Sequence, residues 1–207
     1  MRLSVENLVV ERGSRRILDG VSFHVDAGEA LVLIGPNGAG KTTLIRTVAG
    51  LIGAADGSIR LDGGDPDKDV AQQAHYIGHL NALKPSLTVE ENLRFWAEYL
   101  GGSSVNGAAI DEALAAFDLD ALAMIPAGYL SAGQKRRACL ARLVATVRPL
   151  WLLDEPTVSL DAASVQLLAR QVARHAAGGG LVLAATHIPL GLASERRLEL
   201  GMRSAAA

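Results

Sequence analysis

The most informative stretch of this chain is GPNGAGKT, residues 35–42. Before it stands ALVLI, residues 30–34, a short and continuously apolar run that is typical of a strand buried on both faces of a parallel sheet. After it comes a segment whose apolar spacing predicts a helix that ends near Gly50. The spacing G-x-x-x-x-G-K-[ST] between a strand and a helix predicts a loop that binds phosphate.

Each residue type in this loop suits phosphate chemistry. Glycines let the backbone wind so tightly that successive N–H groups point at the β- and γ-phosphates of a nucleotide, and the following helix adds the positive end of its dipole. Lys41 would supply a point charge to these phosphates, and the hydroxyl of Thr42 would bind Mg²⁺. The candidate nucleotide-binding residues are Gly35, Pro36, Asn37, Gly38, Ala39, Gly40, Lys41, Thr42 and Thr43.

A second candidate motif is LWLLDE, residues 150–155, an apolar strand that ends in two acids. Carboxylates at the carboxyl edge of a parallel sheet lie where ligands bind. We expect Asp154 to hold Mg²⁺ through water and Glu155 to polarise the attacking water. Such an ending alone fits a solvated strand end equally well, but its place after a phosphate loop makes the catalytic interpretation strong.

Three shorter motifs accompany these two. LSAGQ, residues 130–134, opens a predicted helix, and Ser131 suits its N-cap, where the hydroxyl and nearby N–H groups make an anion site. By itself this pattern also describes a plain capped helix. SLD, residues 159–161, follows the acid pair, and His187 ends the next strand, where it could contact the γ-phosphate. A single histidine at a strand end is more often incidental.

The order of predicted elements indicates an α/β domain with a helical insert. Strand patterns over residues 3–11, 16–25 and 57–63 surround the phosphate loop, and strands return near 149–155, 178–187 and 196–201. We predict one domain over residues 1–207. Its core comprises residues 1–78 and 147–207, with N-terminal antiparallel strands and a mostly parallel central sheet.

The insert covers about residues 79–146 and carries LSAGQ. Within it, Thr88 and Glu91 form a capping-box pattern at a helix start. Residues 101–107 suggest a flexible connector, and residues 108–123 suggest one amphipathic helix. The basic run Lys135–Arg137 is expected to lie on a solvated helix face, and Cys139 in the core.

Composition narrows the possible partners. A formal charge of −2 and a pI near 6.2 give no electrostatic reason to expect nucleic acid. The single cysteine suits a reducing compartment. Because the chain has neither a secretory leader pattern nor an apolar run of membrane-spanning length, we expect a soluble chain that meets a membrane only through partners.

Together these motifs resemble the ATP-binding-cassette (ABC) ATPases, whose phosphate loop, LSGGQ-like signature, acid pair, SLD loop and histidine occur once each and in this order. The resemblance covers almost the whole chain. It implies the ABC-ATPase version of the P-loop NTPase fold, with ATP and Mg²⁺ bound. It also implies a head-to-tail dimer of two copies. In that dimer ATP held by residues 35–42 of one copy is covered by the other copy's Ser131, Ala132, Gly133, Gln134 and Asp161.

Two departures from the usual ABC pattern stand out. Most ABC ATPases have a glutamine at the entry to the helical insert, where it contacts Mg²⁺ and the attacking water, and here that place falls on His79. An aromatic residue usually stacks on adenine, and here its place falls on Arg12, whose guanidinium can also stack on a flat ring. His79 is thus a candidate catalytic and metal-binding residue. An uninvolved loop histidine and a solvated turn arginine remain the alternatives.

These departures resemble one subgroup, the ATP-binding subunits of the haem export (cytochrome c maturation) transporter. The similarity rests on YIGHLNALKPSLTVEENL, MIPAGYLSAGQKRRACLARL, PLWLLDEPTVSLD and GGGLVLAATHIPL. It implies a peripheral subunit on the cytoplasmic face of the bacterial inner membrane, bound to integral membrane transporter subunits. ATP hydrolysis there would drive release of a haem-loaded periplasmic chaperone. An ABC ATPase for another transported substrate is the alternative, and DNA-repair or translation ABC proteins fit less well because they carry long inserts or tandem cassettes.

Overall fold

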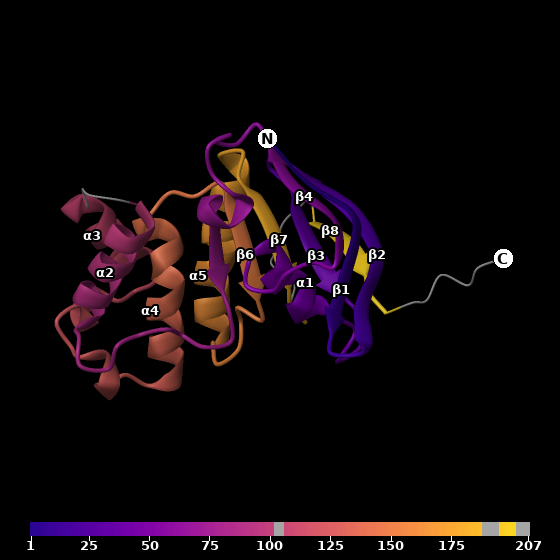
Figure 1. Ribbon diagram of the computed structural model, residues 1–207. Coiled ribbons are helices and arrows are strands. Elements are labelled where there is room, and N and C mark those ends of the chain that lie inside the picture. The colour runs from indigo at the N-terminus through magenta and orange to yellow at the C-terminus, as the bar shows by residue number, and fades with distance from the viewer. Residues whose placement is uncertain (102–105, 188–194, 202–207) are drawn as a thin grey trace.

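The computed structural model describes residues 1–101, 106–187 and 195–201. Most of the predicted connector over residues 101–107 falls outside these ranges. A lobe of helices lies on one side of a central α/β core, and an antiparallel sheet lies on the other (Figure 1). This arrangement agrees with the predicted α/β class.

The central sheet is parallel throughout and has the order β5-β6-β7-β3-β8. Its strands are β3 (Ala30–Ile34), β5 (Ala74–Ile77), β6 (Leu150–Asp154), β7 (Leu181–Ala185) and β8 (Glu195–Glu199). Every residue of β6 and β7 is buried, as their continuous apolar runs predict. Because all strands run the same way, the loops after β3, β5, β6 and β7 meet at one edge.

Side chains of alternate residues along the strands of this sheet pack into two separate hydrophobic cores. Leu150 and Leu152 of β6 face a core shared with α1 (Lys41–Val48) and the antiparallel sheet. Trp151 and Leu153 of the same strand face a core shared with α5 (Ala162–Ala177) and the helical lobe. The period of two along a strand therefore divides the packing between the two sides.

The antiparallel sheet has the order β2-β1-β4. It consists of β1 (Arg2–Arg12), β2 (Arg15–Asp26) and β4 (Asp56–Asp62). Leu3, Val5, Leu8 and Val10 of its central strand are buried against the core. The N-terminal antiparallel strands predicted from sequence are thus present.

The helical lobe contains α2 (Val89–Gly101), α3 (Gly107–Ala116) and α4 (Ala132–Ala145). Short 3₁₀ turns complete the connections: η1 (Val70–Gln73), η2 (Asp120–Leu122) and η3 (Ala127–Tyr129). The capping box before α2 is confirmed, since Thr88 N donates to Glu91 Oε2 at 2.8 Å and Glu91 N donates to Thr88 Oγ1 at 3.1 Å. None of the helices that the structure describes combines the length and the apolar character that a membrane span requires.

Two predictions inside the lobe are wrong. The single helix expected over residues 108–123 ends at Ala116, because Asp118 adopts a left-handed φ of 52° that turns the chain and buries both Phe117 and Leu119. The run Lys135–Arg137 is not a solvated face, because Arg136 is only 2% exposed. Arg136 lies one and two helical turns before Leu140 and Leu143, which are also buried, so it shares the inward stripe of α4. Cys139 is buried, as predicted.

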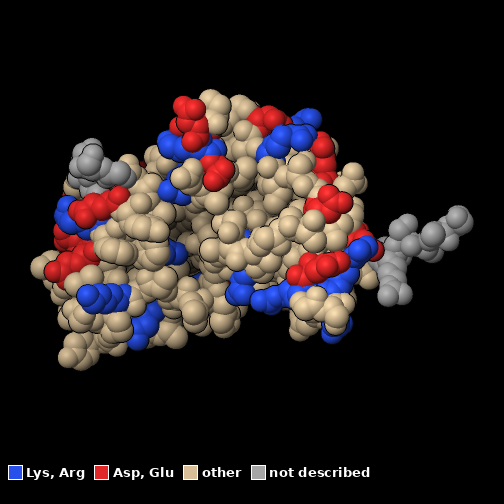
Figure 2. Space-filling model, viewed as in Figure 1, with Lys and Arg blue, Asp and Glu red and all other residues tan. Residues whose placement is uncertain are grey.

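Charge is mixed on the face of the molecule seen in Figure 2. Acidic and basic residues are mixed around its periphery, while the charged atoms visible inside the hollow in the middle of this face are basic. Most of the ion pairs that the structure describes join exposed partners, such as Arg60 with Glu6 and Lys68 with Asp65. Pairs of this kind contribute little to folding stability.

Candidate active site at the carboxyl edge of the parallel sheet

The phosphate loop connects β3 to α1, as its motif predicts. Gly35 has a φ of 134°, and a Cβ built on it would collide with the backbone carbonyl of Leu200. Only glycine fits there. Lys41 is buried at the start of α1, and its ammonium donates to the carbonyls of Gly35 at 2.7 Å and Pro36 at 3.1 Å. The charge of Lys41 is therefore held over the inner side of the loop.

Thr42 and Asp154, the two oxygen ligands predicted for Mg²⁺, lie in contact. Thr42 Oγ1 donates to Asp154 Oδ1 at 2.9 Å, although the residues are 112 positions apart in sequence. A hydroxyl and a carboxylate beside a phosphate loop fit Mg²⁺, which takes few protein ligands and completes its shell with phosphate oxygens and water. No cluster of three or more His, Cys, Asp or Glu residues that could hold a metal ion by itself occurs in the described parts of the chain.

Glu155 follows β6 directly and has a backbone φ of 49°, a left-handed conformation that is uncommon for glutamate. Its N–H donates to the carbonyl of Ala185 at 2.8 Å, which ties it to the end of β7. Its carboxylate lies 3.4 Å from Nε2 of His187, and the two side chains are 28% and 66% exposed. The structure thus brings together the predicted base and the predicted γ-phosphate contact.

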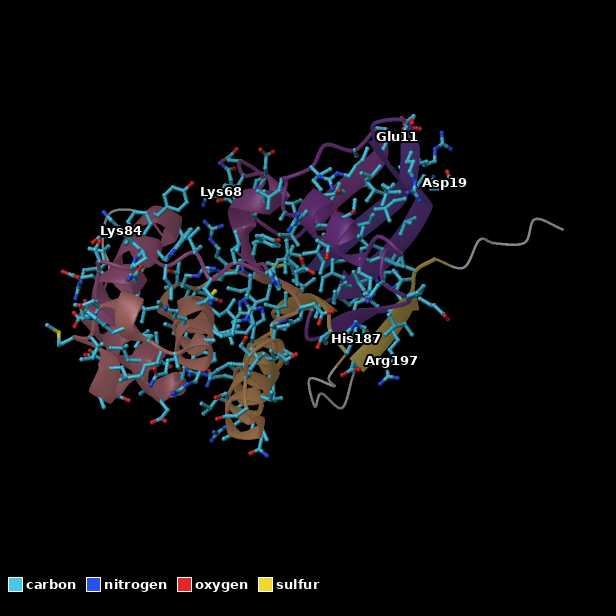
Figure 3. The ribbon with its side chains drawn as sticks, turned by 90° about the horizontal axis from the view of Figure 1, so that it is seen from below. Glu11, Asp19, Lys68, Lys84, His187 and Arg197 are labelled. Atoms are coloured by element: carbon cyan, nitrogen blue, oxygen red, sulfur yellow. The ribbon has the colours of Figure 1, made fainter. Side chains whose placement is uncertain are left out.

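A small cavity of about 170 Å³ opens beside this pair. Gly35, Thr186, His187 and Arg197 contribute to its lining, and Figure 3 shows His187 and Arg197 beside each other. Sequence reasoning did not single out Arg197. Arg197 pairs in register with Val32 of β3, and its Nε lies 3.4 Å from Oε1 of Glu195, which also lines the cavity.

The signature motif occupies a different place, at the start of α4 in the helical lobe. Ser131 is the N-cap, as predicted: its hydroxyl accepts from Gln134 N at 3.2 Å, and Gln134 Oε1 accepts from Ser131 N at 2.8 Å. A Cβ on Gly133 would lie 3.0 Å from the carbonyl oxygen of Ser159, so glycine allows the SLD loop to approach closely. Ser131 and Ala132 are exposed.

Asp161 is the N-cap of α5. Its carboxylate accepts from Ser164 N at 2.8 Å, and this hydrogen bond lowers the pKa of the Asp161 carboxyl. Ser159, two residues earlier, has a left-handed φ of 67°. The SLD loop is therefore held between two helix starts, those of α4 and α5.

His79 and Arg12 lie away from the phosphate loop's inner side but line one cavity together, of about 550 Å³. His79 is exposed, two residues beyond β5. Since Ile77 pairs with Leu153 of β6, continuing that register places His79 level with Glu155. Arg12 is exposed at the end of β1. No contact in the described part of the chain joins either residue to Thr42 or Asp154, and their roles stay predictions.

The other histidine of this segment, His75, has a structural place. It is buried on β5, and its Nε2 lies 2.7 Å from the carbonyl oxygen of Thr146. Burial lowers the pKa of His75 to about 3, and the nearby charges of Arg148 and Arg142 act in the same direction. A neutral ring whose Nε2–H donates to this carbonyl satisfies both observations.

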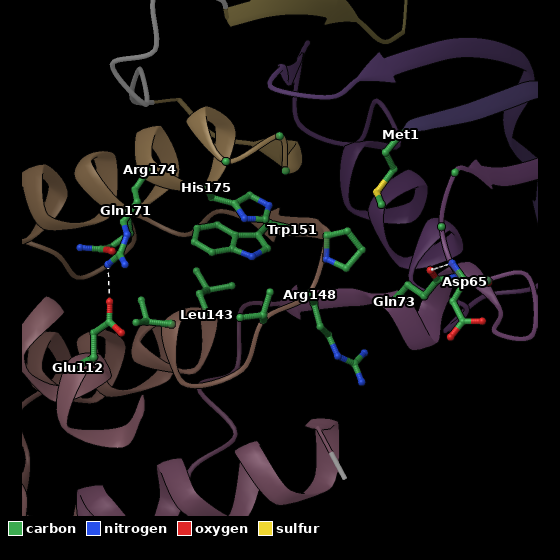
Figure 4. Close-up of a pocket in the computed structure, with 18 residues that line it drawn as sticks. Met1, Asp65, Gln73, Glu112, Leu143, Arg148, Trp151, Gln171, Arg174 and His175 are labelled. Carbon is green, nitrogen blue, oxygen red and sulfur yellow. Dashed lines mark hydrogen bonds and ion pairs between the residues drawn. The ribbon is translucent and has the colours of Figure 1, made fainter. Parts of the chain in front are cut away.

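A further cavity, of about 610 Å³, lies at the amino end of the sheet, remote from the phosphate loop (Figure 4). Its wall includes Trp151, whose ring stacks on that of His175 with centroids 4.0 Å apart. Burial lowers the pKa of His175. None of the predicted site residues lines this cavity.

Similarity to known proteins covers nearly the full chain. A family model described as ABC transporter matches residues 18–158. The cytochrome c biogenesis ATP-binding export protein CcmA of Nitrobacter winogradskyi is 52% identical over 97% of this chain and 98% of its own length. The protein of the same name from Mesorhizobium japonicum is 50% identical over 93% of this chain and 94% of its own length.

Solved structures give the same picture of the fold. An ATP-binding subunit of an ABC transporter superposes with a TM-score of 0.80 at 30% identity, over 91% of this chain and 80% of that one. A dimeric ATP-binding cassette in a post-hydrolysis state, bound to ADP and Pi, superposes with a TM-score of 0.79 at 24% identity, over 96% of this chain and 94% of that one.

Proposed function

The chain belongs to the ABC transporter family as its ATP-binding, ATP-hydrolysing subunit, and from that premise we propose that it serves a haem-export complex for cytochrome c maturation. The names of its relatives and their identity over almost the whole chain support this assignment. One observation in the structure carries the catalytic part: Thr42, Asp154, Glu155 and His187 converge beside the phosphate loop.

We propose that ATP is hydrolysed by in-line attack of water on the γ-phosphoryl group. Glu155 orients the water, while Lys41 and His187 stabilise the charge that develops on the phosphoryl oxygens. Thr42 and Asp154 would hold Mg²⁺, which neutralises phosphate charge when bound. Positioning and fixed charge, rather than a covalent intermediate, supply the rate.

Two copies are needed in this proposal. The exposed Ser131 and Ala132 lie on the helical lobe, whereas the phosphate loop lies on the core. In a head-to-tail dimer, the signature Ser131–Gln134 and Asp161 of one copy would cover ATP bound to residues 35–42 of the other. The helix N-terminus behind Ser131 adds the positive end of a dipole, which suits a phosphate.

The proposed contact with the membrane subunits is the 550 Å³ cavity that His79 and Arg12 line. It joins the core to the helical lobe, and four arginines but no acidic residue line it. At its rim Leu80 and Tyr99 are 81% and 73% exposed, and Arg142 stacks on Trp96 at 4.3 Å. A partner segment with apolar and acidic side chains would complement this surface. The chain would then be a peripheral protein on the cytoplasmic face of the inner membrane.

Gene replacement tests the transport assignment. The gene is deleted in its native host and returned as wild type, as Lys41→Ala or as Glu155→Gln, at matched protein levels. We expect wild type alone to restore covalently bound haem in c-type cytochromes, measured by haem staining of separated membrane proteins. A deletion strain with normal c-type cytochromes, in which the purified chain still hydrolyses ATP, would instead assign the chain to another transported substrate.

A further inference from the structure

Arg136 is a buried arginine that joins helix α4 to two segments of the site, residues 78–81 and 155–156. Its Nη1 donates to the carbonyl of Gly78 at 2.8 Å, its Nη2 to the carbonyl of Glu155 at 2.7 Å, and its Nε to the carbonyl of Pro156 at 3.0 Å. Nη1 also lies 3.3 Å from Oδ1 of Asn81. One guanidinium from the signature helix α4 therefore holds the backbone of the predicted base Glu155, the backbone of the next residue, Pro156, and the start of the loop that contains His79.

The partners of Arg136 are all neutral. In the part of the chain that the structure describes, no carboxylate lies within ion-pair distance of it, although only 2% of the residue is exposed. Burial accordingly lowers the pKa of the guanidinium. A buried charge without a counter-ion is costly. Packing alone does not explain why an arginine stands at position 136, because an apolar side chain would fill the inward face of α4 beside Leu140 without that cost.

Two of the carbonyls that Arg136 binds, those of Glu155 and Pro156, belong to a strained turn. Glu155 has a φ of 49°, a conformation that persists only where its surroundings enforce it. From one side, the Glu155 N–H is held by Ala185. From the other, its carbonyl is held by Arg136. With both peptide groups fixed, the direction in which the carboxylate leaves the backbone is fixed as well.

We propose that Arg136 is a positioning residue for ATP hydrolysis, which clamps the carbonyls of Glu155, Pro156 and Gly78 so that the Glu155 carboxylate is aimed at the attacking water. This inference rests on the proposed role of Glu155. Because Arg136 is part of α4, the clamp also joins the helix that Ser131 caps to the catalytic base. A rotation of the helical lobe would thus reach the base through one side chain.

The direct test is Arg136→Gln, with Arg136→Lys as the conservative variant and Arg137→Gln as the matched control. Arg137 is the next residue of the same helix, but its guanidinium binds the carbonyls of Phe117 and Asp118 inside the lobe. A displacement of about 1 Å at a reacting group can cost roughly 10²-fold in rate. For Arg136→Gln we expect a kcat loss of that order, with KM for ATP and nucleotide binding to the monomer little changed.

Arg136→Lys keeps the positive charge but loses the forked set of guanidinium N–H donors. Its kcat should therefore lie between those of Arg136→Gln and wild type. Arg137→Gln should keep kcat within about threefold, since Arg137 binds neither of the two segments that Arg136 holds. All rates are measured below the onset of thermal unfolding of each variant. If Arg136→Gln does not fold, the comparison of Arg136→Lys with Arg137→Gln decides. The proposal is overturned if Arg136→Gln and Arg136→Lys both keep the wild-type kcat. If Arg136→Gln does not fold, a wild-type kcat in Arg136→Lys is enough to overturn it.

A double-variant cycle separates positioning from general damage. Adding Arg136→Gln, or Arg136→Lys, to Glu155→Gln should lower the residual single-turnover rate no further, because the group that it positions is already gone. A second, multiplicative loss would show that Arg136 acts elsewhere and would overturn the proposal. If Glu155→Gln itself hydrolyses ATP normally, the proposed function of Glu155 fails first, and the cycle reveals that separately.

Discussion

Glu155 shows at the scale of one residue how the site is assembled. Its left-handed backbone, its bond to the end of β7 and its contact with His187 all depend on residues far away in the chain. Lys41 and Thr42 are the opposite case, since their positions follow from a loop and a helix start that the sequence spells out locally. The motifs therefore predict which residues form the site. They do not predict what holds Glu155 in place.

Arg136 is the clearest residue that sequence reasoning missed. Its carbonyl partners lie 58, 19 and 20 positions away, and backbone carbonyls carry no residue-specific signal. The one available signal was its spacing with Leu140 and Leu143 along the helix, which favours an inward direction. Its basic neighbours Lys135 and Arg137 made the run resemble a solvated helix face, so this inward direction was not predicted.

His75 leads to a prediction about pH. Its folded pKa of about 3 lies below the ordinary value near 6.5, so below pH 6.5 the unfolded chain takes up a proton that the folded chain does not. The free energy of unfolding should therefore fall as pH drops from about 6.5 towards 5, by at most about 1.4 kcal/mol per unit for this one group. Urea unfolding at closely spaced pH values measures the slope.

The control for this effect is His75→Gln, which cannot titrate but can donate to the carbonyl of Thr146. Its unfolding free energy should depend less steeply on pH than that of wild type over the same interval. His175, which burial shifts in the same direction, leaves some slope in both proteins. Equal slopes in the two proteins would show that His75 takes up its proton in the folded state.

At the scale of elements, the parallel strands were the most predictable part. Their continuous apolar runs predict strands buried on both faces, and the shared direction places the loops after them at one edge. The helix expected over residues 108–123 failed because its end depends on a left-handed Asp118. No glycine or proline marks that turn, so the buried positions of Phe117 and Leu119 decided it.

Ser131 has two proposed duties at the start of α4, and substitutions can separate them. Ser131→Ala removes the cap and should lower the free energy of unfolding by about 1 kcal/mol. We also expect this variant to lose ATP-dependent dimerisation. Ser131→Asp keeps the cap, since aspartate caps a helix as well as serine. Its carboxylate would face the partner's phosphates, so we expect wild-type stability and ATP binding but no ATP-dependent dimer.

Thermal unfolding and the molar mass in solution with ATP and Mg²⁺ are the two measurements for these variants. A Ser131→Asp protein that dimerises with ATP like wild type would place Ser131 outside the interface and leave it only the capping role seen in the structure.

At the scale of the whole molecule, the two kinds of motif stand apart. The phosphate loop, acid pair and His187 gather on the core, while the signature begins α4 in the helical lobe (Figure 1). The clamp at Arg136 links the two within one chain. One chain therefore carries two half-sites, which in the proposed dimer ATP would join and hydrolysis would separate.

The molar mass of Glu155→Gln in solution tests this account most directly. With hydrolysis blocked and nucleotide binding intact, ATP and Mg²⁺ should convert the variant from monomer to a stable two-chain complex, measured by light scattering after size exclusion. Without Mg²⁺, or with Lys41→Ala added, it should stay monomeric. A Glu155→Gln chain that binds ATP, stays monomeric and releases phosphate at the wild-type rate would contradict both the base and the dimer.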